Sequence, residues 1–102
     1  MKYGLKDSDI LKFQFVFRNF SEIEKAILYG SRAKGNFKPA SDIDLTLIGE
    51  SLNLSVLNRI EIQLDDLLLP YTFDLSILKQ ISNPDLLEHI QRVGVDFYIT
   101  NK

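Results

Sequence analysis

The chain has 102 residues, of which 45% are hydrophobic and 25% charged, with a formal net charge of −2 and a pI near 5.3. This length and composition predict a single globular domain over residues 1–102, and the acidic balance argues against a generic nucleic-acid coat. The absence of cysteine excludes disulfides and thiolate metal sites. No stretch has the apolar run of a signal peptide or a membrane span, so we expect a cytoplasmic protein with no membrane partner.

The first predicted element lies in "SDILKFQFVFRNF", where two periodicities compete. Alternate phenylalanines are typical of a strand, whereas Phe13, Phe17 and Phe20 recur at helical spacing. The apolar run is long for a strand, and Ser8 and Asp9 offer side chains that can cap a helix. The segment therefore favours a helix.

Two strands are predicted next, joined by a turn or a short helix. Residues 24–30, "EKAILYG", form a short apolar run that ends at a glycine, as a buried strand does. In residues 41–49, "SDIDLTLIG", apolar and polar side chains alternate, which indicates a half-buried strand with one polar face. Leucine and isoleucine then recur at helical spacing over residues 53–68, and Pro70 stops that helix.

The C-terminal third predicts a strand, a helix and a short edge strand. Residues 71–78, "YTFDLSIL", alternate like the previous strand. In the helix that follows, Asn83 caps the start, the apolar side chains face inward and Gly94 ends it, before the edge strand at 95–99. The element order predicts an α/β (α+β) fold: a small mixed sheet of three to four strands flanked by helices.

Two aspartates stand one residue apart on the second predicted strand. Asp42 and Asp44 are at positions i and i+2, so both carboxylates leave the same face, roughly 6–7 Å apart. Each raises the pKa of the other unless a cation lies between them. Paired carboxylates without sulfur or imidazole suit hard cations such as Mg²⁺ or Mn²⁺. Taken alone, Asp-x-Asp also fits a strand with a solvated face.

A glycine-rich turn precedes these aspartates. After Gly30, backbone amides at Ser31 and beyond could form an anion-binding nest, since glycine lets a phosphate approach the backbone closely. Gly30 and Gly35 have the glycine spacing of a P-loop, but Asn36 and Phe37 follow where that motif needs Lys and Ser or Thr, so it fails. By itself, the stretch also fits an ordinary turn that uses glycine for positive φ.

The joint pattern is more specific than either part. "LYGSRAKGNFKPASDIDLTL" resembles the nucleotidyltransferase superfamily that includes the DNA polymerase β palm: Gly-Ser, a short spacer, Asp-x-Asp, and an acidic residue on a later strand. Gly30, Ser31, Asp42 and Asp44 match the first part, and Asp74 in "YTFDLSIL" supplies the later acid. The fuller string also looks like the minimal nucleotidyltransferases, the short stand-alone branch of that superfamily, which implies a polymerase β palm-like fold.

The resemblance implies three catalytic carboxylates that also bind metal. Asp42, Asp44 and Asp74 would hold two Mg²⁺ ions, or Mn²⁺, about 3.5–4 Å apart, the spacing that clamps a transferring phosphoryl group. Asp74 would complete the shell of the catalytic ion and help to deprotonate the attacking hydroxyl.

The resemblance also implies an ATP site around the Gly-Ser turn. Gly30 and Ser31 would hold the distal phosphates through backbone amides and the serine hydroxyl. Arg32 and Lys34 would steady the triphosphate charge, although either also fits an ordinary solvated side chain. The single histidine, His89, is expected to be a flank or interface residue rather than a catalyst.

No further segment of the chain can form a platform for the acceptor substrate, so we expect a partner to supply it. The resemblance implies an antitoxin that transfers AMP from ATP to a hydroxyl, in particular a tyrosine, of a helical HEPN-domain toxin, as part of a hetero-oligomer. Two alternatives stay open. The protein could neutralise its partner by complex formation alone, or it could modify a small molecule such as an aminoglycoside, which would need a pocket built by oligomerisation.

Overall fold

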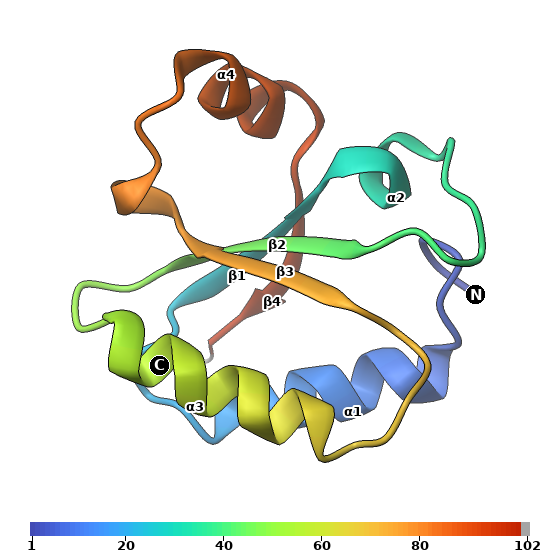
Figure 1. The fold of residues 1–102 in the computed structure, drawn as a ribbon, viewed down its shortest axis with the longest axis horizontal. Coiled ribbons are helices and arrows are strands. Elements are labelled where there is room, and N and C mark those ends of the chain that lie inside the picture. Colours follow the sequence, from blue (N-terminus) through green and yellow to red (C-terminus); the bar gives the residue numbers. More distant parts are fainter. Residues whose placement is uncertain (101–102) are drawn as a thin grey trace.

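A computed structural model describes residues 1–100, in which helices alternate with the strands of one sheet (Figure 1). The elements in chain order are α1 Asp7–Arg18, β1 Lys25–Tyr29, α2 Gly30–Lys34, β2 Ile43–Ile48, α3 Leu54–Asp65, β3 Phe73–Ile77, the 3₁₀ turn η1 Leu78–Gln80, α4 Pro84–Val93 and β4 Val95–Ile99. The strand order is β3-β2-β1-β4; β1 is antiparallel to β2 and β4, and β2 is parallel to β3. The predicted mixed sheet is confirmed, with β4 at an edge.

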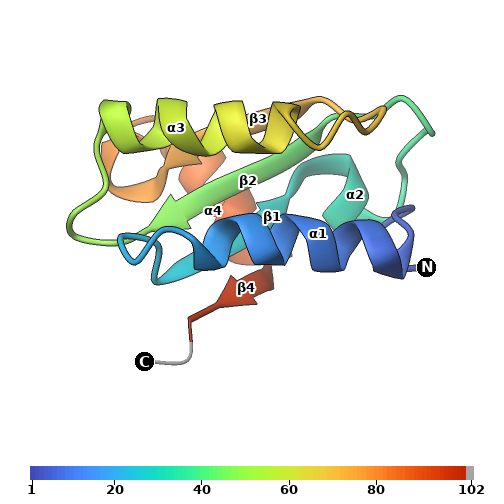
Figure 2. The same ribbon diagram turned by 90° about the horizontal axis from the view of Figure 1, so that it is seen from below.

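Helices cover both faces of the sheet. Helices α1 and α3 lie on one face, and α2 and α4 lie on the other (Figures 1 and 2). The core lies between the sheet and the first pair of helices, where Phe13, Leu28, Leu45 and Ile60 are fully buried. Since side chains alternate along a strand, the polar residues of β2 and β3 point to the side that carries α2 and α4.

Helix α1 confirms the helical interpretation of the N-terminal segment. Phe13 and Phe17 are fully buried on its inner face, whereas 63% of Phe15 is exposed on its outer face. A strand would have placed all three phenylalanines on one side.

The predicted capping of α1 is wrong. The helix begins at Asp7, and Lys6 at the N-cap makes no side-chain capping bond. Asp9, which was expected to cap, is buried and accepts a hydrogen bond of 3.1 Å from the Tyr71 hydroxyl. Its carboxylate therefore ties α1 to the segment that enters β3.

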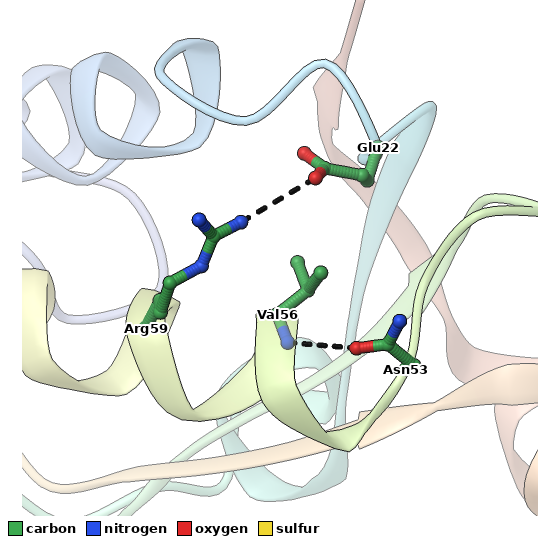
Figure 3. A network of polar contacts seen from close by, with 4 residues as sticks. All are labelled: Glu22, Asn53, Val56 and Arg59. Carbon is green, nitrogen blue, oxygen red and sulfur yellow. Dashed lines mark hydrogen bonds and ion pairs between the residues drawn. The ribbon is translucent and has the colours of Figure 1, made fainter.

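Helix α3 is held at its start by two polar contacts (Figure 3). The Asn53 side-chain oxygen accepts a 2.9 Å hydrogen bond from the Val56 backbone N–H, which satisfies one of the free amides of the first turn. One turn further on, the Arg59 guanidinium lies 3.4 Å from a carboxylate oxygen of Glu22, in the loop before β1. The first contact caps the helix and the second links it to that loop, while the buried side chains of α3 pack it against the sheet.

The two later helices differ slightly from prediction at their limits and faces. Helix α3 ends at Asp65, short of the predicted Leu68, whose φ of 55° is not helical. Asn83 caps α4 as predicted, but of its inward apolar residues only Ile90 is fully buried and the others are half-buried. None of the described helices has the length and apolarity that a bilayer crossing needs.

Candidate active site

Three carboxylates meet at the start of two neighbouring strands. Asp44 on β2 and Asp74 on β3 are partners in the parallel register, so their side chains leave the same face of adjacent strands. Asp42 directly precedes β2, which begins at Ile43. Asp42 and Asp74 are exposed, and Asp44 is half-buried. The fold thus brings together the three acidic residues that the sequence pattern singles out.

The surroundings of Asp44 oppose its ionisation. Burial is the main cause of its raised pKa, and the charges of Asp74 and then Asp42 raise it further. His89 and Arg32 act in the opposite direction and lower it in part. A cation placed among the three carboxylates would relieve this repulsion.

Gly30 packs directly against Asp44. Its φ is +74°, and a Cβ added there would lie 2.1 Å from Asp44 Oδ2, so no other residue fits without displacing the carboxylate. Gly30 opens α2, the short helix that occupies the predicted turn. That helix ends at Lys34, and the N–H of Gly35, the residue that caps it, donates to the Ser31 carbonyl at 2.9 Å.

His89 of α4 reaches the same turn. The Gly30 backbone N–H donates a 3.1 Å hydrogen bond to His89 Nε2, and the imidazole meets the Tyr29 ring edge-on, with centroids 6.1 Å apart. The sequence predicts a flank or interface residue, whereas in the structure the side chain lies at the site. No local pattern could have indicated this, since Gly30 and His89 are 59 positions apart in sequence.

A row of hydroxyl groups lies beside the carboxylates. The Ser76 hydroxyl donates to Thr46 Oγ1 at 2.9 Å, across β2 and β3. Burial of Tyr29 is the main cause of its raised pKa. A hydrogen bond with Ser76 lowers this pKa in part, and the charges of Asp74 and Asp44 raise it further. Residue types alone gave no prediction for this row, although its members share the polar face of the sheet.

Arg32 is buried, whereas a contact with the triphosphate was predicted for it. It is 2% exposed, and its guanidinium donates to the carbonyls of Ser41, at 3.1 and 2.8 Å, of Pro39, at 3.2 Å, and of Tyr3, at 2.9 Å. Instead of facing an open triphosphate site, the side chain fixes the loop that leads into Asp42. Lys34 is exposed, as a phosphate contact requires.

The donor set of the site is suited to a hard divalent cation. All three side chains offer carboxylate oxygens, and their mutual repulsion is the environment in which Mg²⁺ or Mn²⁺ binds. Within residues 1–100, however, no group of three Asp, Glu, His or Cys side chains is already arranged to enclose an ion.

The sheet order, the Gly-Ser turn and the adjacent carboxylates together define the fold of a nucleotidyltransferase. The chain belongs to the family described as Polymerase beta, Nucleotidyltransferase, whose profile matches residues 12–102. By family it is an enzyme of nucleotidyl transfer. Among curated protein sequences, none matches the chain.

Solved structures share this fold at low sequence identity. A chain of a toxin–antitoxin crystal structure with AMP-PNP has a TM-score of 0.71 and 22% identity, over 95% of this chain and 76% of that one. A tri-AMPylated HEPN toxin in complex with its MNT antitoxin, from Shewanella oneidensis, gives a TM-score of 0.68 and 19% identity, over 94% and 74%. The MntA–HepT toxin–antitoxin gives 0.66 and 20%, over 93% and 74%.

Proposed function

We propose that this protein is a metal-dependent protein adenylyltransferase that modifies a HEPN-domain toxin and acts as its antitoxin. The observation that carries the proposal is the pairing of Asp44 with Asp74 in register, beside the Gly30 turn, in a chain of the nucleotidyltransferase family. A similar fold occurs in complexes of HEPN toxins with MNT antitoxins, one of which contains an AMPylated toxin.

The carboxylates have separate tasks in this proposal. Asp42, Asp44 and Asp74 would hold two Mg²⁺ or Mn²⁺ ions, which supply Lewis-acid stabilisation of the charge on the transferring phosphoryl group. Asp74 is exposed at the edge of the site, so it can accept the proton of an acceptor hydroxyl that approaches from solvent. Half-buried Asp44 has Gly30 packed against it, which limits its movement.

ATP would bind with its triphosphate against α2. Because the Gly30 amide already donates to His89, we assign the phosphate contacts to the Ser31 hydroxyl and amide and to exposed Lys34. The acceptor oxygen attacks the α-phosphorus, the bond from that phosphorus to the β-phosphate oxygen breaks, and pyrophosphate leaves. The chain's contribution is orientation and charge placement rather than a covalent intermediate.

The acceptor in this proposal is a tyrosine hydroxyl of the toxin. The carboxylates lie at the start of β2 and β3, with Asp42 and Asp74 open to solvent, so a partner surface can present its hydroxyl there. A similar chain was solved with AMP-PNP, which supports ATP as the nucleotide.

The test combines the purified protein, ATP labelled on the α-phosphate, Mg²⁺ and the HEPN-domain product of the neighbouring open reading frame. We expect label on a partner tyrosine, located by mass spectrometry, and none with Asp44→Ala or in the presence of EDTA. Label that persists in Asp44→Ala would refute the assignment of the site. Label without added divalent ions would refute its metal dependence.

One observation favours a second candidate, a nucleotide-binding module that silences its partner by binding alone. In the described part of the chain, the acidic side chains do not form a ready three-ligand metal group. Neutralisation of the toxin by Asp42→Ala and Asp44→Ala, tested in cells and with purified proteins, separates the two functions. Full neutralisation by both variants would establish binding as sufficient, whereas its loss, with an intact complex, would establish catalysis.

A further inference from the structure

The contact between His89 and Gly30 joins α4 to the most constrained point of the site. His89 Nε2 accepts the Gly30 N–H at 3.1 Å, so the imidazole is a hydrogen-bond acceptor toward this turn. The bond spans 59 positions and connects a half-buried side chain of α4 to the junction of β1 with α2. A hydrogen bond of this kind holds two elements at a fixed distance.

The other side of Gly30 touches a carboxylate. The position that a Cβ would occupy is 2.1 Å from Asp44 Oδ2, so the Gly30 backbone and this oxygen are in van der Waals contact. A displacement of the turn would therefore change the space that is left to the Asp44 carboxylate. Tyr29, the residue before the turn, pairs with Asp44 in the β1–β2 register and packs its ring against the imidazole.

Helix α4 is otherwise weakly anchored. Ile90 is its only fully buried residue among the described positions, and its Glu88–Arg92 ion pair, at 3.1 Å, is exposed and stays within the helix. The polar contact from α4 to the site thus comes through His89. Since the imidazole accepts a hydrogen bond from a backbone amide, it can act on the carboxylate through the Gly30 turn, in addition to the electrostatic effect by which it lowers the pKa of Asp44.

We propose that His89 is a positioning residue for the nucleotidyltransferase site: it fixes the Gly30–Ser31 turn against Asp44. The inference rests on the proposed function for its catalytic consequence, but its structural part stands apart from it. His89 holds the turn by accepting one hydrogen bond. A side chain that keeps an acceptor at this place preserves the geometry, and an apolar one of similar size does not.

The first measurement is amide hydrogen exchange at Gly30, followed by NMR, which needs no substrate. His89→Leu is expected to accelerate Gly30 exchange at least about five-fold relative to the wild type, because one hydrogen bond to the amide is lost. His89→Gln, whose side-chain oxygen can accept the same bond, is expected to retain most of the protection. Unchanged exchange in His89→Leu would overturn the proposal, whether or not the wild type transfers nucleotide.

The second measurement is steady-state nucleotidyl transfer to the HEPN-domain partner. His89→Leu is expected to lower kcat about 10- to 100-fold with a smaller change in the KM for ATP, since misplacement of the carboxylate affects the reacting geometry. Recovery in His89→Gln separates this role from a general loss of folding, and Gln91→Ala, an exposed position of the same helix, is the control. Wild-type kcat in His89→Leu, or equal loss in the Leu and Gln variants, would overturn it. If the proposed function itself is wrong, the wild type will show no transfer, and this result differs from every outcome that would overturn the role of His89.

Discussion

Asp44→Asn is expected to stabilise the free protein while it abolishes transfer. The substitution keeps the shape of the side chain and removes a charge that is half-buried beside two like charges. Asp44 and Asp74 are register partners on neighbouring strands, and such strands lie about 4.8 Å from each other. At about 5 Å two unit charges repel by about 0.8 kcal/mol in water and about 3 kcal/mol at an effective dielectric constant of 20. Because Asp74 is exposed, we expect a gain near the lower limit, about 1 kcal/mol.

Thermal unfolding followed by circular dichroism measures this gain. For a domain of this size, about 1 kcal/mol corresponds to an increase in Tm of about 4–8 °C. The melts are recorded in EDTA, since a bound divalent ion would stabilise the wild type and hide the difference. Glu61→Gln, an exposed carboxylate on α3, is the matched control and is expected to change stability by less than about 0.5 kcal/mol.

The pH dependence supplies a second check with a defined sign. The folded-state pKa of Asp44 is raised, so the wild type binds this proton more tightly when folded and loses stability as pH rises through the range between the ordinary value of 3.8 and the raised one. The asparagine variant lacks that loss. Its advantage should therefore be small near pH 4 and larger near neutral pH. A variant that is less stable than the wild type at pH 7 would refute the like-charge account of the site.

Three other substitutions test the supports of the fold. Gly30→Ala is expected to destabilise the protein by more than about 1 kcal/mol and to abolish transfer. The control is Gly35→Ala, where φ is also positive but the Cβ position is open; it should cost less stability and keep activity. Equal effects of the two substitutions would refute the clash with Asp44. Arg32→Lys is expected to cost about 2–3 kcal/mol in urea unfolding, because an ammonium has its donors on one nitrogen and lacks the planar fork whose separate nitrogens reach the carbonyls of Tyr3, Pro39 and Ser41. A neutral result would contradict that assignment. Asn53→Ala is expected to cost about 0.5–2 kcal/mol in thermal melts, against no loss for exposed Asn58→Ala; equal stabilities would exclude the cap.

The periodicity of the sequence and its local chemistry were sufficient to predict most of the fold. The helical spacing of the phenylalanines outweighed their alternation because the apolar run is longer than a strand usually is, and the 63% exposure of Phe15 agrees with this. Asn83 marked the start of α4 through capping, which depends only on nearby residues, and Gly94 follows the last residue of the helix in an extended rather than a left-handed conformation. The capping of α1 was mispredicted, because the Asp9 side chain bonds Tyr71, far along the chain.

The site was predictable where its residues share a motif or a register. Asp42 and Asp44 stand in one short string, and the alternation of β3 put Asp74 on a polar face that then paired with β2. His89 and Arg32 were placed differently from expectation, since their partners depend on tertiary packing. A buried arginine that bonds only carbonyls and a histidine that bonds an amide leave no pattern in neighbouring residues.

These two residues clarify how so small a chain keeps repelling carboxylates in place. Asp42 follows Ser41, whose carbonyl accepts two hydrogen bonds from the Arg32 guanidinium, and Asp44 lies under the turn that His89 holds. Arg32 and His89 both form their hydrogen bonds with the backbone, so neither side chain neutralises a carboxylate by direct pairing. The negative charge that a divalent cation would need is thereby retained, at a cost in stability that the raised pKa of Asp44 reflects. Direct salt bridges at these positions would make the fold more stable and the site poorer at binding metal.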